Sequence, residues 1–181
     1  MTAKRIIILL TSLLWVAVAA AVIASKQHTL RTGARALLET EPVDPRDFLR
    51  GDYVILGYKI GSLDINKLIT EKPEYKEGET VYVKLLPDED KFWKAAVISS
   101  AKDLYGPGDI FIKGRVRSFY SNKLSVDYGI ESYFVPEGKG GVIEKNMRRD
   151  SANVVSVEAC IDRSGGAVIN RIFINGKEIV F

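Results

Sequence analysis

The longest hydrophobic stretch of the chain lies near its N-terminus, where residues 6–25 (IIILLTSLLWVAVAAAVIAS) carry no charged side chain. As an α-helix these residues would span about 30 Å, the thickness of the hydrocarbon core of a bilayer. A cleavable signal peptide is the alternative, because Lys4 and Arg5 precede the run and Val22-Ile23-Ala24 offers a cleavage site. The run is longer than the roughly 7 to 15 apolar residues of a signal peptide. The pattern therefore favours an uncleaved transmembrane helix that contacts the lipid bilayer through residues 6–25.

The rest of the chain alternates between apolar and polar positions in short runs, as β-strands with one buried face do. In DYVILGYKI, four alternate side chains would share one face: Val54, Leu56, Tyr58 and Ile60. Further strands are expected at residues 36–40, 78–86, 92–99, 108–116, 123–129, 152–162, 167–174 and 177–181. Asn175-Gly176 predicts a type I′ hairpin turn before the last of them.

Helical signals are weak after the N-terminal segment. SLDINKLI, residues 62–69, begins with a good N-cap residue and favours a short helix, and residues 137–150 are predicted as a polar helix or loop. We therefore expect a mainly β fold: an N-terminal transmembrane helix followed by an antiparallel β-sandwich or partly open barrel with one or two short helices. The expected units are a membrane anchor at 1–25, a juxtamembrane segment with the first strand at 26–45, and a β-rich domain at 46–181.

Charge and composition exclude several classes of protein. The 26 Lys and Arg residues and 23 Asp and Glu residues are interspersed along the chain, whereas a nucleic-acid-binding protein gathers its basic residues on one face. The single cysteine, Cys160, excludes an internal disulfide, and the single histidine, His28, excludes the usual zinc clusters. We expect no nucleic-acid partner, no metal site and no cofactor, and we expect Cys160 to be a packed residue within a strand.

Three glycine–acid pairs precede alternating runs: Gly51-Asp52, Gly78-Glu79 and Gly108-Asp109. Glycine admits the positive φ that a tight turn requires, and a neighbouring acidic side chain can accept hydrogen bonds from nearby backbone amides. The three pairs are therefore predicted to form turns that lead into strands.

Two longer motifs resemble a known family. RGDYVILGY, residues 50–58, matches every fixed position of the motif for which the GDYXXLXY family is named. YGIESYFVPEGKG, residues 128–140, resembles the second hallmark of that family, and the closing GGAVINRIFINGKEI is similar to its C-terminal hairpin. The resemblance spans roughly residues 33–179. It implies a bacterial membrane-anchored protein of unassigned biochemical function, often encoded beside a polytopic membrane protein.

The resemblance also carries over residues with candidate roles. With the aromatic Tyr133 added, the candidates for contacting a partner or ligand are Arg50, Asp52, Tyr53, Tyr58, Tyr128, Glu131, Tyr133 and Glu137. The positions interpreted as turns or packing residues are Gly51, Leu56, Gly129, Phe134, Pro136 and Gly138. We expect the acids Asp52, Glu131 and Glu137 to belong to a polar network that fixes the fold. The alternative is a cleft in which these acids converge on a ligand.

The expected function is that of an accessory or interaction domain that binds a polytopic membrane protein. The positive charges flanking residues 6–25 are nearly balanced, but a five-residue tail before that segment and a whole domain after it favour an extracytoplasmic domain on the bacterial cytoplasmic membrane. An exposed patch containing Arg50, Tyr53 and Tyr133 would contact the partner, since aromatic and Arg side chains dominate interface energies.

The alternative function is a small-ligand-binding or hydrolytic domain. GDYV, GDIFI and YFVPEG loosely resemble the β-rich catalytic domain of type I signal peptidases, which also carry an N-terminal anchor. Such an enzyme needs a serine just after the membrane helix and a lysine that deprotonates it. Here Ser25 lies within the apolar run and no Ser-x-Pro motif follows. The Ser/Lys dyad is missing, and no enzymatic activity is expected.

Overall fold

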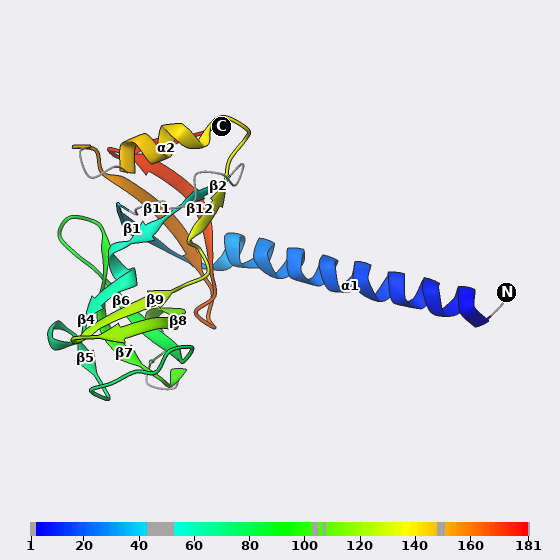
Figure 1. Cartoon of the computed structure of the whole chain (residues 1–181), viewed down its shortest axis with the longest axis horizontal. Helices are drawn as coiled ribbons and strands as arrows, with labels where there is room; N and C mark the ends of the chain where they lie inside the picture. The colour runs from blue at the N-terminus through cyan, green and yellow to red at the C-terminus, as the bar shows by residue number, and fades with distance from the viewer. Residues whose placement is uncertain (1–2, 43–52, 103–104, 107, 148–150, 181) are drawn as a thin grey trace.

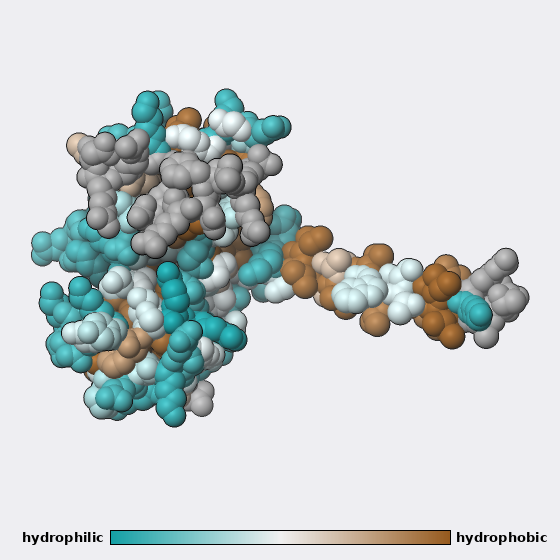
Figure 2. All heavy atoms as spheres, viewed as in Figure 1, coloured by the Kyte–Doolittle hydropathy of each residue, from teal (hydrophilic) through white to brown (hydrophobic). Residues whose placement is uncertain are grey.

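The computed structural model describes residues 3–42, 53–102, 105–106, 108–147 and 151–180. A single long helix, α1 (Ala3–Thr32), projects from a β-rich domain (Figure 1). Hydrophobic residues dominate much of its surface in Figure 2. The part from Ile6 to Thr32 is long and apolar enough to cross a membrane, a property that a membrane anchor shares with a signal sequence.

The domain contains two large sheets that curl into a half-barrel, as the mainly β prediction required. The first sheet has the order β13 (Lys177–Ile179), β12 (Ala167–Ile174), β11 (Val155–Ile161), β1 (Ala34–Glu41) and β3 (Gly57–Tyr58). The second has the order β4 (Ser62–Asp64), β9 (Lys123–Asp127), β8 (Ile110–Tyr120), β6 (Thr80–Pro87), β7 (Trp93–Ser99) and β5 (Ile69–Thr70). Neighbouring strands are antiparallel except β5 and β7, which run parallel.

Smaller elements complete the domain. A two-stranded ribbon pairs β2 (Tyr53–Ile55) with β10 (Ser132–Phe134), and the short helix α2 (Gly140–Met147) contacts β2 and β11. The 3₁₀ turns η1 (Lys59–Gly61) and η2 (Ile65–Lys67) lie on either side of β4. α2 lies within the segment for which a polar helix or loop was expected.

One hydrophobic core is shared by both sheets. Alternate residues of β6, Val81, Val83 and Leu85, are almost fully buried, and Leu38 of β1 joins the same cluster. Removing such side chains from water contributes about 1.5 to 3 kcal/mol each. The period-two pattern in the sequence therefore identified the faces that the fold buries.

The short helix expected at residues 62–69 is present only as the 3₁₀ turn η2, and strand residues lie on both sides of it. Ser62 and Leu63 begin β4, where Leu63 pairs with Leu124 of β9, and a single 3₁₀ turn follows. Asp64 is the residue that caps this turn, because its carboxylate accepts a hydrogen bond from the amide of Asn66. Leu63 and Ile65 are both buried. The two buried side chains are thus two residues apart, as in a strand, although the apolar residues of the segment also fit helical spacing.

The turns are as predicted where the structure describes them. Gly78 and Gly108 have φ angles of +79° and +97°, values that glycine adopts without strain. The neighbouring acids accept backbone hydrogen bonds of 3.1 Å, Glu79 from Lys76 and Asp109 from Gly106. Asn175 and Gly176 both have positive φ, as a type I′ turn requires. The third pair, Gly51-Asp52, lies outside the described residues.

Candidate functional site

The described part of the first hallmark segment, residues 53–58, lies beside the second, residues 128–140. Their strands β2 and β10 pair antiparallel, with Tyr53 opposite Phe134 and Val54 opposite Tyr133. Beyond the ribbon, the amide of Leu56 donates a 2.7 Å hydrogen bond to the carbonyl of Glu131. Segments separated by more than seventy positions in the sequence thus form one local structure.

Two buried tyrosines connect these segments further. The hydroxyl of Tyr58 donates a 2.7 Å hydrogen bond to the carbonyl of Ile130. The hydroxyl of Tyr128 donates to the carbonyl of Ile60. Burial raises the pKa of both phenols above the ordinary value, and the negative charge of Glu131 adds to the effect. Both phenols therefore stay protonated and remain hydrogen-bond donors at neutral pH.

Glu131 holds the turn between β9 and β10. Its carboxylate accepts hydrogen bonds from the amides of Tyr128 and Gly129, and Gly129 adopts a φ of +78°. Both oxygens of the Glu131 carboxylate thus accept hydrogen bonds from backbone amides. Glu137, in contrast, is exposed on the surface, so these two acids do not converge in a cleft. Arg50, Gly51 and Asp52 lie outside the described residues.

The end of the second hallmark leads into α2. Gly138 has a φ of +75°, and the amide of Lys139 donates a 3.0 Å hydrogen bond to the carbonyl of Pro136. After this turn, α2 packs against β2 and β11, and its residues Ile143 and Met147 are buried. Pro136 and Gly138 therefore occupy a turn, the role expected from the sequence.

An aromatic pair, the partly buried Tyr53 and the exposed Phe134, lies at the end of the β2–β10 ribbon. The rings of Tyr53 and Phe134 are 6.0 Å apart between centroids, and Phe134 is 77% exposed. Tyr133, the next residue along β10, instead packs against the core. Phe134 was expected to be a packing residue and Tyr133 an exposed one. The alternation of a strand fixes only that the two side chains point to opposite faces, and the tertiary fold decides which face is buried.

A second region of interest is the junction between α1 and the domain. α1 passes into β1 through Gly33, whose amide donates a 2.8 Å hydrogen bond to the carbonyl of Thr29. A Cβ atom on Gly33 would lie 2.5 Å from that carbonyl oxygen and 3.0 Å from the backbone of Ile161. Only glycine fits this position without rearrangement, so the helix meets the domain in close contact.

The turn between β11 and β12 binds the end of α1. The carboxylate of Asp162 accepts hydrogen bonds from the amides of Ser164 and Gly166, from the Ser164 hydroxyl, and from the hydroxyl of Thr29, which is 3% exposed. Burial alone would raise the pKa of Asp162, but these hydrogen bonds outweigh it and hold the pKa below its ordinary value. The same turn contacts β8, because the carbonyl of Gly165 accepts a 2.8 Å hydrogen bond from the amide of Lys113.

Sequence reasoning found no role for Asp162. A turn was expected between the strands at 152–162 and 167–174, but Thr29 is 133 positions away from Asp162 and no local pattern connects them. Cys160 is buried as predicted, and its thiol lies 3.6 Å from the carbonyl of Leu30 in α1. Burial raises the pKa of this thiol, which keeps it protonated.

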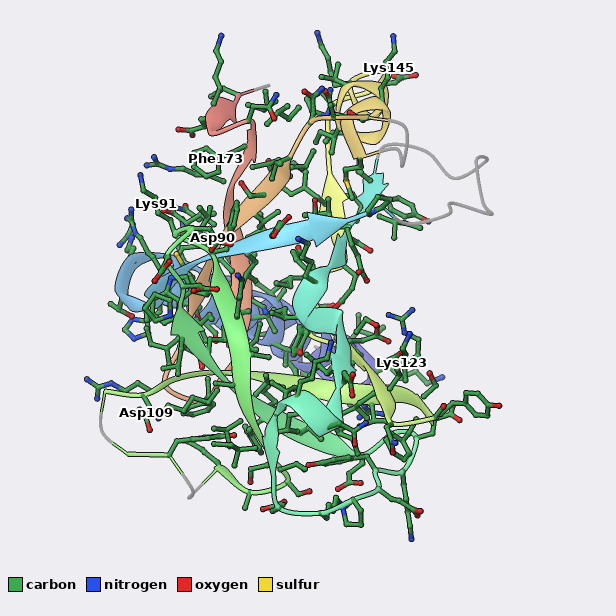
Figure 3. The ribbon with its side chains drawn as sticks, turned by 90° about the vertical axis from the view of Figure 1, so that its left-hand side faces the viewer. Asp90, Lys91, Asp109, Lys123, Lys145 and Phe173 are labelled. Carbon is green, nitrogen blue, oxygen red and sulfur yellow. The ribbon has the colours of Figure 1, made fainter. Side chains whose placement is uncertain are left out.

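A cavity of about 830 Å³ opens beside this junction. Four polar residues of α1 line one wall at helical spacing: Ser25, His28, Thr29 and Thr32. The start of β8 and the β11–β12 turn form the other walls. Asp109, labelled in Figure 3, lines the cavity just before β8 begins, and its carboxylate is 2.7 Å from the ammonium group of Lys84. Within the described part of the chain, no group of three or more His, Cys, Asp or Glu side chains could hold a metal ion.

The fold and these contacts define a β-rich domain, carried directly on a long apolar helix, in which two hallmark segments hold each other in place. A family model described as GDYXXLXY protein matches residues 15–172. The chain belongs to the GDYXXLXY family, as its motifs indicated. Comparisons with curated proteins and with solved structures give no match.

Proposed function

We propose that this protein is a single-pass, membrane-anchored accessory domain that binds a polytopic membrane protein on the extracytoplasmic side of the bacterial cytoplasmic membrane. The observation that carries the proposal is the direct passage of α1 into the β-domain through the tightly packed Gly33. A domain attached in this way cannot move far from the bilayer. It is therefore presented to other proteins in the same membrane.

The length of α1 supports this arrangement. Its 30 residues extend about 45 Å. Residues 6–25 would cross the hydrocarbon core of about 30 Å, and residues 26–32 would add about 10 Å, enough to pass the headgroup layer. The β-domain would then begin at the membrane surface. Confinement of both partners to one membrane raises their effective concentration, so a small interface suffices for binding.

The contacts of α1 also favour an anchor over a cleaved signal peptide. A cleavage site after Ala24 would lie inside a continuous helix, about one turn before the buried Thr29. Proteolysis acts preferentially on exposed, loosely held segments. Thr29 and Leu30 are instead held to Asp162 and Cys160 of the domain.

We propose the Tyr53–Phe134 pair, in which Phe134 is exposed and Tyr53 is partly buried, as the centre of the partner interface. Aromatic side chains at the centre of an interface often contribute more than 2 kcal/mol to binding. In Figure 1, β2 lies on the side of the domain from which α1 projects. The pair is therefore placed to contact the membrane-proximal loops of a polytopic protein.

Co-purification in mild detergent tests the interface. The tagged full-length chain is co-expressed with a candidate polytopic membrane protein, of the kind that the family resemblance implies, and the amount retained is compared among variants. Phe134→Ala and Tyr53→Ala should each reduce retention by about tenfold or more. Tyr120→Ala, which removes an aromatic residue that is 83% exposed elsewhere, and Glu137→Gln should leave retention unchanged. Full retention by both aromatic variants would contradict this interface.

Orientation is tested separately with reporter fusions. Alkaline phosphatase fused after Phe181 should be active, because the enzyme requires export from the cytoplasm. Inactivity of this fusion, together with activity of a cytoplasmic reporter at the same position, would show the reverse orientation.

A further inference from the structure

We propose that the cavity beside the base of α1 binds the phosphate-bearing headgroup of a membrane phospholipid. The inference rests on the membrane anchoring proposed above, and it concerns a site distinct from the Tyr53–Phe134 pair. The location of the cavity is the first reason. Its helical wall begins at Ser25, the last residue of the uncharged run, and ends at Thr32. In an anchored chain this wall lies at the depth of the lipid headgroups.

The face of α1 that lines the cavity is polar from Ser25 onward, where the hydrocarbon core of the bilayer would end. Ser25 lies three residues before His28 and four before Thr29, and Thr32 lies four and three residues after them, so the four side chains share one face of α1. Thr29 is buried against the domain, whereas Ser25, His28 and Thr32 are exposed where they line the cavity. Their polar groups are therefore accessible to a ligand that enters the cavity.

The charges around the cavity favour an anionic group. Both acids that line it are already compensated, Asp109 by the ammonium group of Lys84 and Asp162 by its four hydrogen bonds. The groups that can donate hydrogen bonds to an anion include the charged guanidinium of Arg163 and the imidazole of His28. Within the described part of the chain, Arg163 forms no ion pair with a carboxylate. Guanidinium groups bind phosphate oxygens with paired, charge-assisted hydrogen bonds.

The remaining lining is apolar. Ile110 and Phe111 at the start of β8 and Ile161 at the end of β11 contribute to the walls. The volume of about 830 Å³ falls in the range of small-molecule sites, about 300 to 1,000 Å³. A phospholipid combines the two required properties, since its phosphate would meet Arg163 and His28 and its glycerol and upper acyl carbons would meet the apolar walls. A free phosphate ion would use only the polar part.

The single histidine provides a direct readout. The purified full-length protein, labelled with ¹³C at the Cε1 atom of histidine, gives one imidazole signal in a nuclear magnetic resonance spectrum. In dodecyl maltoside micelles it is titrated in three separate experiments with dihexanoylphosphatidylglycerol, inorganic phosphate and octyl glucoside. These probes supply phosphate with acyl chains, phosphate alone, and an alkyl chain alone. The intact mass, measured beforehand, shows whether α1 is present, and partner capture plays no part in the assay.

The expected result is a saturable shift of the His28 signal with dihexanoylphosphatidylglycerol only. Arg163→Gln should weaken this binding by about tenfold or more, the effect of losing a charge-assisted hydrogen bond. The matched control Arg31→Gln removes the same charge from the end of α1 but from a residue that does not line the cavity, and it should bind as the unmodified chain does. Absence of a saturable shift, equal binding by Arg163→Gln, or equal saturation by inorganic phosphate alone would overturn the proposal.

Discussion

Tyr58 and Tyr128 form a reciprocal pair: each hydroxyl donates a hydrogen bond to the carbonyl that lies two residues beyond the other tyrosine. Both rings are buried, and each belongs to a different hallmark segment of the family. The signature tyrosines therefore hold the two segments together. This arrangement leaves the neighbouring, exposed side chains of the ribbon free for binding.

Removal of either hydroxyl should destabilise the domain. Tyr58→Phe or Tyr128→Phe leaves a buried carbonyl without this donor, at a cost of about 1 to 3 kcal/mol. For a chain of this size that cost lowers the midpoint of thermal unfolding by roughly 2 to 10 °C. Circular dichroism of the full-length protein in mild detergent measures the change. Tyr120→Phe, at an exposed position, is the control, and a midpoint for either test variant equal to that of the control would contradict the role assigned to the pair.

Gly114 in β8 makes room for the Tyr128 ring. A Cβ atom at this position would lie 2.3 Å from Cγ1 of Val126 and 2.9 Å from Cδ1 of Tyr128. Gly114→Ala should therefore cost about 1 to 3 kcal/mol through overpacking. Gly141→Ala is the matched control, because nothing lies within 4 Å of its Cβ position in α2 and alanine favours helix. Thermal unfolding should separate the two variants in opposite directions, and equal tolerance of both would show that the strands adjust around Tyr128.

Two glutamates of the second hallmark should respond differently to the same substitution. The Glu131 carboxylate accepts from two backbone amides, and glutamine retains only one acceptor oxygen. Glu131→Gln should therefore lower stability by about 1 to 2 kcal/mol, whereas Glu137→Gln on the exposed surface should stay within about 0.5 kcal/mol of the unmodified chain. The midpoint of denaturant unfolding compares them. A larger loss for Glu137→Gln would indicate a contact that the structure does not show.

Acid should weaken the connection between α1 and the domain. The pKa of Asp162 is depressed in the fold, so its contribution is fully present above the ordinary pKa of aspartate, about 3.9, and is lost as the pH falls through the lower folded value. Asp162→Asn lacks this titration. We expect the difference in unfolding midpoint between the unmodified chain and Asp162→Asn to be constant from pH 7 to about 5 and to shrink below about 4. A difference that persists unchanged at low pH would contradict the assignment.

Several features of the fold follow from local sequence, because local physics determines them. Side-chain alternation identified the buried residues of β6, and the pairing of Asn175 with Gly176 identified a turn that requires two positive φ angles. The same reasoning did not distinguish strand from helix in the segment that begins at Ser62, because its apolar spacing suits both. Pairing with β9 decided the outcome, and that contact lies about sixty positions away.

The candidate site was less predictable for the same reason. The sequence placed Glu131 in a polar network, but it could not show that the network belongs to backbone amides of the adjacent turn. The exposure of Phe134 depends on which face of the β2–β10 ribbon packs against the core. The hydrogen bond between Thr29 and Asp162 joins residues that lie 133 positions apart in the sequence. Such long-range contacts are fixed by topology, which a local pattern does not encode.

The membrane anchoring proposed for this protein requires that α1 remain attached to the β-rich domain. The most direct measurement is the intact mass of the protein extracted from carbonate-washed bacterial membranes. Carbonate removes peripheral proteins, so a chain retained by the pellet is integrated in the bilayer. If α1 is an uncleaved anchor, the species retained in the membrane has the full mass of 20.1 kDa, apart from processing of the initiating methionine. A soluble species that lacks the residues before Ser25 would contradict the proposed anchoring.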